Sequence, residues 1–321
     1  MLTRREVLLA AAAAAAMTRI PSVFAKASQP TTRVNFDVPA GACDCHTHIH
    51  APEFPFYSGR VYTPEPAMPD EMAALHKALH IQRVVIVTPS VYGTDNRPTL
   101  LGIKARGNDA RGVAVIDDKT PDSELDSLQK AGFRGIRLNL ATSGVNDPNV
   151  ARKQFQAAAD RMKSRNWHVQ LNTSLAVIAA IKDSLAASAV PIVFDHFGGA
   201  EPEKGPGQPG FADLIELVRS GKAYVKISVT AGPRSDYSGF EPLAKALIAA
   251  NVDRIVWGTN WPHPNSKTAP GRKPTDLTPL WQVDDGLVFN QLPRWAPDAG
   301  VRKKILVDNP ARLYGFPALA A

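Results

Sequence analysis

The stretch DCHTH places two imidazoles, His46 and His48, one residue apart. If the stretch is a strand, alternation puts Asp44 on the same face as both histidines. Cys43 and Cys45 then face the other way, and we read them as small buried residues rather than a redox pair. Two imidazoles that project in one direction suit a divalent metal ion or a hydrogen-bonded acid–base pair.

Two later stretches, FDHFGG and IVWGTNWPHP, also end apolar runs in polar residues. The first carries Asp195 and His196, followed by two glycines that free the backbone for close approach to a ligand. The second carries Asn260 and His263. Asn260 stands where a hydrolase would use a carboxylate base, and its amide is neutral. We interpret the neighbouring Trp257 as a hydrophobic plug.

Further polar residues follow other predicted strands, and we take them as candidates for substrate contacts. Arg137 ends one strand, where the alternative is a salt-bridged structural arginine. Ser90 and Tyr92 follow another strand. Arg234 and Tyr237 lie in AGPRSDYSG after a third.

Short apolar runs alternate with amphipathic stretches along the chain, which predicts strands alternating with helices. Eight such units favour a parallel (β/α)₈ barrel, of the α/β class, with its working groups at the carboxyl ends of the strands. A doubly wound open sheet is the alternative, although no glycine-rich phosphate turn follows the first strand. The predicted strands are 43–48, 83–88, 112–116, 134–139, 168–172, 192–197, 224–228 and 254–259.

The amino end indicates an export signal. Arg4 and Arg5 form a twin-arginine pattern, followed by an alanine-rich apolar stretch that is too short to span a bilayer. We therefore predict a cleaved signal at residues 1–25 and a periplasmic protein; the alternative is a disordered tail. An extended lead-in at residues 26–42 precedes a single barrel domain at residues 43–321.

The composition excludes some partners. The chain has 321 residues and a net charge of +7, without a basic run interleaved with aromatic residues. We therefore expect no nucleic-acid binding and no membrane association after signal cleavage. A small molecule is the expected partner.

Four motifs together carry a family resemblance: DCHTH, FDHFGG, GTNWPHP and DNPARLYGF. They resemble the amidohydrolase-related (amidohydrolase 2) family, and within it the branch of 2-pyrone-4,6-dicarboxylate lactonase and D-galactarolactone isomerase. The resemblance covers roughly residues 41 to 316. It implies a distorted TIM barrel that acts on small oxygenated, often carboxylated lactones.

The resemblance also implies roles for single residues. His46, His48 and His196 match the family's site histidines. Asn260 falls where most members carry an aspartate, and His263 falls on the Pro-His that follows it. We count the three histidines and Asn260 as catalytic candidates.

Arg137 matches an arginine that binds a substrate carboxylate. Two departures from the pattern matter. Metal-dependent members use a histidine on the fifth strand, where this chain offers Gln170 or Asn172. The pyrone lactonases carry another arginine after the fourth strand, where residues 138–144 read LNLATSG. A pyrone dicarboxylate is therefore a doubtful substrate.

We expect a lactone hydrolase that uses histidine and arginine and needs no metal. If a metal is bound, we expect zinc on His46, His48 and His196. A sugar-acid lactone isomerase is the first alternative, because attack by the substrate's own hydroxyl demands less of the base. An exported lactone-binding protein without activity is the second.

Overall fold

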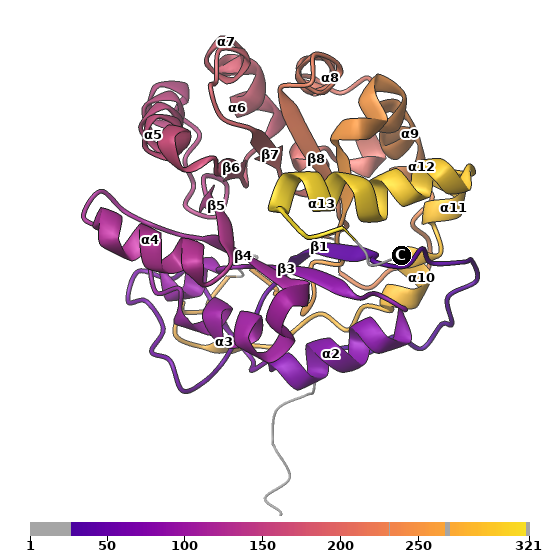
Figure 1. Cartoon of the computed structure of the whole chain (residues 1–321), viewed down its shortest axis with the longest axis horizontal. Coiled ribbons are helices and arrows are strands. Elements are labelled where there is room, and N and C mark those ends of the chain that lie inside the picture. The colour runs from indigo at the N-terminus through magenta and orange to yellow at the C-terminus, as the bar shows by residue number, and fades with distance from the viewer. Residues whose placement is uncertain (1–26, 231, 267–269, 319–321) are drawn as a thin grey trace, which may run out of the picture.

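The computed structural model describes residues 27–230, 232–266 and 270–318 (Figure 1). The predicted export signal at residues 1–25 lies outside this part of the chain. The lead-in from residue 27 runs along the barrel. Ser28 accepts a hydrogen bond at its carbonyl from the Trp261 indole, and Thr31 and Thr32 bind the Asp284 carboxylate.

Eight parallel strands form one sheet in the order in which they occur in the chain, as the barrel prediction requires. All eight predicted strands are present, with ends shifted by at most a few residues. The strands are β1 (Cys43–Thr47), β3 (Arg83–Val87), β4 (Ala110–Ala114), β5 (Phe133–Leu138), β6 (His168–Leu171), β7 (Ile192–Phe194), β8 (Ala223–Ile227) and β9 (Ile255–Trp257).

Helices follow the strands and surround the sheet in Figure 1. Local signals fix several helix ends; for example, α5 begins after Asp147, whose carboxylate accepts from the Asn149 amide. The helices are α2 (Pro69–Ala78), α3 (Arg97–Arg106), α4 (Asp122–Lys130), α5 (Pro148–Met162), α6 (Leu175–Ala180), α7 (Lys182–Ala186), α8 (Phe211–Arg219), α9 (Phe240–Asn251), α10 (Asp285–Phe289), α11 (Leu292–Trp295), α12 (Ala299–Lys303) and α13 (Asn309–Tyr314).

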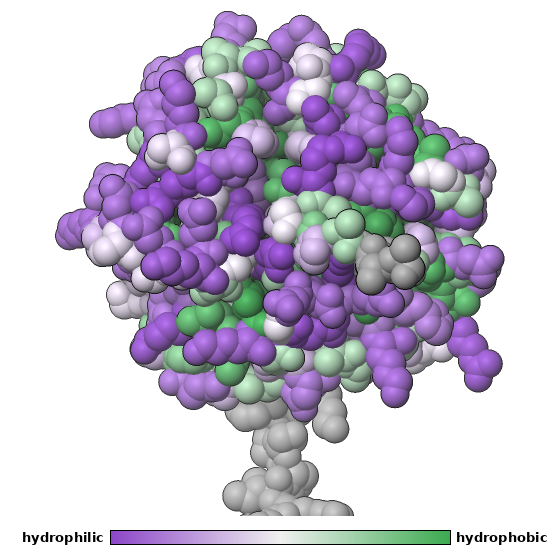
Figure 2. Space-filling view, in the orientation of Figure 1, coloured by the Kyte–Doolittle hydropathy of each residue, from purple (hydrophilic) through white to green (hydrophobic). Residues whose placement is uncertain are grey.

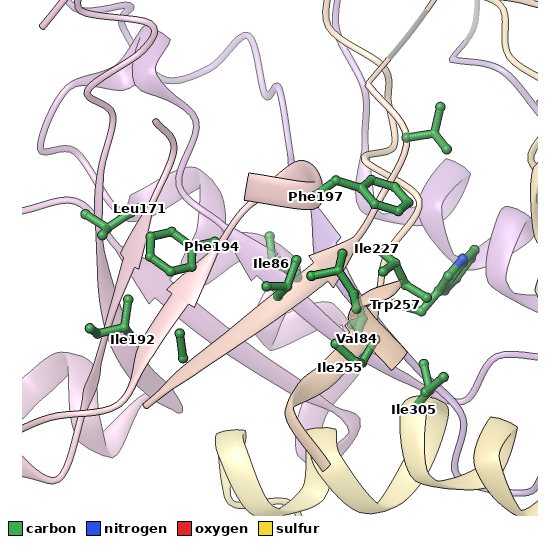
Figure 3. Close-up of a cluster of buried hydrophobic side chains, with 14 of the residues drawn as sticks. Val84, Ile86, Leu171, Ile192, Phe194, Phe197, Ile227, Ile255, Trp257 and Ile305 are labelled. Atoms are coloured by element: carbon green, nitrogen blue, oxygen red, sulfur yellow. The ribbon is translucent and has the colours of Figure 1, made fainter. Parts of the chain in front are cut away.

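Side chains on the two faces of the strands pack into two separate hydrophobic cores. Outward side chains, such as Phe194, Ile227 and Trp257, pack against the helices in the larger core (Figure 3). Trp257 packs against Phe289 of α10 with the ring planes tilted by 37°, which agrees with its interpretation as a hydrophobic plug. Inward side chains form a smaller apolar layer inside the barrel, which includes Cys43, Cys45, Val85, Val87, Val113, Val193, Tyr224 and Val256.

Contacts between β1 and the segment after β9 close the barrel. The Asn260 amide donates to the His46 carbonyl at 2.9 Å, and the His48 amide donates to the Trp261 carbonyl at 2.9 Å. A side chain at Gly258 would put its Cβ 2.8 Å from the backbone nitrogen of His46. Only glycine therefore allows the two strands to approach this closely.

The expectation that Asp44 shares a face with His46 and His48 is wrong. Between the pairs Asp44–Val84 and Thr47–Ile86, β1 has one more residue than β3. The extra residue makes a β-bulge, which breaks the alternation of faces. Asp44 points outward to His76 of α2, while the histidines enter the barrel on the same side as the cysteines.

Asp44 joins the first and last strands through its buried carboxylate. It accepts hydrogen bonds from the backbone amides of His46 and Thr259, both at 3.0 Å, and from the Thr259 hydroxyl at 2.6 Å. His76 Nε2 lies 3.2 Å away. Among the described strands, β1 and β9 are not paired by a ladder of backbone hydrogen bonds. The Asp44 carboxylate therefore serves as the acceptor for two backbone amides that this ladder would otherwise satisfy.

Charged and polar residues cover most of the face shown in Figure 2, with small apolar areas between them. Among the described residues, no helix combines the length and the apolar character needed to cross a membrane.

Replacing Asp44 with alanine should destabilise the barrel. The Asp44→Ala variant leaves buried donors without an acceptor, and we expect its free energy of unfolding to fall by about 3 kcal/mol in urea titrations. Asp118→Ala, at an exposed aspartate, is the control and should change stability by less than about 0.5 kcal/mol. Equal stability of both variants would contradict the closing role of Asp44.

Candidate active site

A cleft of about 810 Å³ opens at the carboxyl ends of the strands. A short parallel pair of strands, β2 (Thr63–Pro64) and β10 (Leu277–Thr278), connects two loops beside the cleft. The lining of the cleft combines hydroxyl and amide groups with few charged groups. Among the predicted residues, the cleft is lined by His48, Ser90, Arg137, His196, Arg234 and Asn260.

Beneath the cleft, a buried ion network centres on Asp195. One carboxylate oxygen, Oδ2, accepts from Arg137 Nε at 2.9 Å and from Gln170 Nε2 at 3.1 Å. The other, Oδ1, lies 3.4 Å from Lys226 Nζ and 3.1 Å from His46 Nδ1. These side chains come from β1, β5, β6, β8 and the end of β7, so the network exists only in the closed barrel.

The Lys226 ammonium has two hydrogen-bond partners and one ion-pair partner. Its Nζ lies 2.7 Å from Gln170 Oε1, 3.2 Å from His46 Nδ1 and 3.4 Å from Asp195 Oδ1. The Lys226 side chain is fully buried. A buried ammonium requires such partners, because its desolvation is otherwise very costly.

The members of the network differ in their protonation states near pH 7. Burial lowers the pKa of Lys226, and it lowers the pKa of His46 well below the ordinary histidine value. Burial would raise the pKa of Asp195, but His46, Lys226 and Arg137 together hold it well below its ordinary value. The imidazoles are therefore neutral near pH 7, and Asp195 is ionised.

His48 has a partner at each ring nitrogen. Nδ1 lies 2.7 Å from the Val87 carbonyl, so this nitrogen must carry the proton, and Nε2 lies 3.3 Å from His46 Nε2. Burial lowers the pKa of His48 well below its ordinary value, which keeps the ring neutral. With both nitrogens occupied, His48 has no free site for a proton from a substrate.

His196 is different, because only one of its ring nitrogens is engaged. Nδ1 lies 3.2 Å from the Ser228 hydroxyl. Within the described residues, the hydrogen bond of the ring is the one at Nδ1, and the ring lines the cleft. Burial lowers the pKa of His196 to about 4, so the ring is neutral near pH 7, and in the tautomer that donates Nδ1–H to Ser228 the Nε2 atom is the basic nitrogen.

Backbone strain is concentrated at this site. Four of the six non-glycine residues with positive φ in the described chain lie here: His196, Phe197, Asn260 and His263. Such residues cluster at functional sites, where the surrounding structure holds them in place. Gly199 lines the cleft, and a Cβ at this position would lie 2.5 Å from the Thr173 carbonyl. Glycine is therefore required here by a close approach within the protein itself.

Three predicted substrate residues do not line the cleft in the described structure. The Tyr92 hydroxyl donates to the Ala51 carbonyl. Tyr237 is buried near Phe240. His263 Nε2 lies 2.9 Å from the buried carboxylate of Asp285, which directs the ring away from a ligand.

The sequence analysis missed Lys226 and the central place of Asp195. The sequence places Lys226 within the predicted strand 224–228, and Gln170 where metal-dependent members of the family use a histidine. A signal existed, because a lysine between apolar residues of a buried parallel strand needs buried partners. Which partners it finds depends on the barrel.

Comparisons with known proteins agree with this geometry. The family model for amidohydrolases matches residues 43–316. The chain belongs to the amidohydrolase family. A 2-pyrone-4,6-dicarboxylate hydrolase from Comamonas testosteroni is 33% identical over 305 residues, which cover 91% of this chain and 94% of that protein.

Two further proteins extend the comparison. A D-galactarolactone isomerase from Agrobacterium fabrum is 28% identical and covers 90% of this chain and 96% of that protein. An apo crystal structure from Agrobacterium tumefaciens superposes with a TM-score of 0.72 at 25% identity, covering 90% of this chain and 100% of that one. The predicted family and barrel fold are thereby confirmed.

Some amidohydrolase structures contain metal. One from Burkholderia multivorans, 18% identical with a TM-score of 0.61 over 87% of this chain and 100% of that one, has bound zinc. In the present chain His46, Asp195 and His196 place one donor atom each within 4.8 Å of one another. This set differs from the predicted one, in which His48 took the place of Asp195.

The donor set does not fit a divalent cation. Lys226 already contacts His46 Nδ1 and Asp195 Oδ1, and Arg137 occupies Asp195 Oδ2. A divalent ion would lie beside two cations with one carboxylate to compensate them. Asn260 adds only a neutral amide, which is a weak ligand for zinc.

Buried neutral histidines should make stability depend on pH. Burial lowers the pKa of His50 and His168 to about 3 and of His196 to about 4. An unfolded histidine titrates near about 6.5, so below that pH the unfolded state binds more protons. The free energy of unfolding should fall by at least about 2 kcal/mol from pH 7 to pH 4 in urea titrations.

His168 provides the control for this pH dependence. It packs edge-on against Tyr314 inside the barrel, away from the cleft. The His168→Gln variant should reduce the proton uptake on unfolding by up to about one proton between pH 6 and pH 4. If the free energy of unfolding of this variant changed with pH as steeply as that of the wild type, His168 would not be a buried neutral ring.

Proposed function

We propose that this protein is a lactone hydrolase in which His196 is the general base. The observation that carries the proposal is the free Nε2 of His196 at the cleft, beside a histidine pair whose nitrogens are all engaged. The curated relatives, which include a hydrolase and an isomerase of lactones, support this substrate class.

Each group has a role in opening a lactone. A water oxygen attacks the carbonyl carbon, and His196 Nε2 takes the proton. Arg137 binds Asp195 only through Nε, and within the described residues its two terminal nitrogens have no hydrogen-bond partner. They polarise the carbonyl and stabilise the developing oxyanion. The ring C–O bond then breaks, the proton passes to the ring oxygen, and the product is a hydroxy acid.

The charges of the cleft favour a substrate with at most one carboxylate. Arg234 is paired with Glu203 at 2.7 Å, and Glu201 is paired with Lys204 at 2.7 Å. The loop after β5 contributes Thr142 to the lining, with no second arginine. Among the described lining residues, Arg137 is then the one arginine that has no surface carboxylate as its partner, so it can bind one substrate carboxylate or carbonyl. The many hydroxyl and amide groups of the lining suit a hydroxylated ring.

A lactone isomerase is the second candidate, and the chemistry of the bases favours it. His196, with a pKa near 4, is a weak base, and Asn260 supplies no carboxylate to assist it. A substrate hydroxyl held next to the carbonyl reacts more readily than water, because its approach is intramolecular.

A panel of five- and six-membered lactones with zero, one or two carboxylates tests the function. We expect acid release, followed with a pH indicator, and kcat/KM values at least about ten-fold lower for dicarboxylates. Ring exchange without acid, seen by NMR, would establish the isomerase instead. Saturable binding with neither reaction would identify a binding protein.

The role of His196 is tested on the best substrate of that panel. His196→Asn keeps a residue that tolerates positive φ but removes the base, and kcat should fall at least about 100-fold. His80→Asn, at an exposed histidine with φ 57°, is the matched control and should keep full activity. Unchanged turnover in His196→Asn would refute the base assignment.

Metal independence is part of the proposal and needs its own measurement. The purified protein should contain less than one zinc per chain by elemental analysis and keep its activity after chelation, because Lys226 and Arg137 occupy Asp195. Stoichiometric metal, or activity restored only when metal is added back, would contradict this mechanism.

A further inference from the structure

The buried ammonium of Lys226 lies next to the histidine pair of β1, His46 and His48. His46 Nε2 and His48 Nε2 face each other at 3.3 Å, a separation that two tetrahedral zinc ligands can adopt. To bind zinc, both Nε2 atoms must be free of protons. The position of the His46 proton therefore decides what the pair can do.

The partners of these rings allow one neutral arrangement. His48 carries its proton on Nδ1, because that nitrogen faces the Val87 carbonyl at 2.7 Å, so its Nε2 is an acceptor. His46 Nε2 must then donate to it, since two lone pairs would otherwise oppose each other. His46 Nδ1 is consequently an acceptor, and Lys226 Nζ, 3.2 Å away, is its donor.

The other tautomer of His46 has a competing partner. With a proton on Nδ1, His46 could donate to Asp195 Oδ1 at 3.1 Å. That proton would point at the Lys226 ammonium, and Nε2 would face the lone pair of His48. A carboxylate behind a histidine is the arrangement that supports a metal-binding ring. Lys226 therefore acts against the tautomer that Asp195 would otherwise favour.

We propose that Lys226 is a positioning residue that locks His46 with its proton on Nε2, and so converts a histidine pair able to bind zinc into a metal-free hydrogen-bond chain. The chain runs from Lys226 to His46, from His46 to His48, and from His48 to the Val87 carbonyl. Every nitrogen in it is engaged, which leaves His196 as the available base. The inference rests on contacts inside the barrel and does not depend on which lactone is the substrate.

The wild-type protein tests the lock directly. Long-range ¹⁵N–¹H NMR distinguishes a protonated ring nitrogen from a free one, and the His46 signals can be assigned by their loss in His46→Gln. We expect His46 Nε2 to be protonated and Nδ1 to be free at pH 7. A proton on Nδ1 would overturn the proposal, whatever the protein's activity.

Lys226→Met removes the ammonium and keeps a side chain of similar length. We expect the Nδ1-protonated form of His46 to appear in the spectrum. Zinc, titrated alone against a chromophoric chelator, should bind at least about ten-fold more tightly than to wild type, because a cation beside the site is gone. Lys222→Met, at an exposed lysine just before β8, is the matched control and should leave both readouts unchanged.

Activity supplies a third readout if a lactone substrate has been found. Loss of the lock should lower kcat by at least about ten-fold while KM changes less than about three-fold, because Lys226 does not line the cleft. Unchanged zinc affinity and an unchanged His46 tautomer in a folded Lys226→Met protein would reduce Lys226 to a packing residue. If that variant does not fold, the wild-type spectrum still decides the question.

Discussion

The buried ion network around Asp195 is the constraint on which the rest of the site depends. A carboxylate inside a barrel is stable only when charged partners replace its hydration. Here Arg137 satisfies one oxygen and Lys226 lies near the other, from strands on either side of β7. The partners must therefore stay in register, and the same contacts that hold the barrel interior together fix the position of every imidazole beneath the cleft.

In the proposed mechanism, the network allows an amidohydrolase barrel to keep its histidine pair without a metal ion. Two side-chain cations and one carboxylate leave the interior with a net positive charge, provided by the chain itself. A metal ion can exchange a ligand when the substrate binds, and it can hold a water molecule at an open coordination position. The Lys226 ammonium does neither. In that mechanism the base, His196, is weak, which suits an activated ester such as a lactone ring.

Barrel closure and the site are linked through β1. The bulge that turns Asp44 outward brings His46 inward, so the same extra residue serves both stability and chemistry. Asp44 then binds the backbone of Thr259, next to Asn260, and the Asn260 amide binds the His46 carbonyl. The DCHTH and GTNWPHP motifs, which are distant in the chain, thus become one unit, and a change that loosens the closure should also displace the imidazoles.

The sequence by itself determined the eight alternating units, the family, and six of the residues that line the cleft, because strand periodicity and local motifs are written in consecutive residues. It did not determine the face of Asp44, since a bulge depends on pairing with another strand. It also placed Tyr92, Tyr237 and His263 among the substrate contacts, although their partners Ala51, Phe240 and Asp285 draw them elsewhere. Only the tertiary structure decided that Lys226 and Asp195 meet, because the partners of a buried charge come from strands that are distant in sequence.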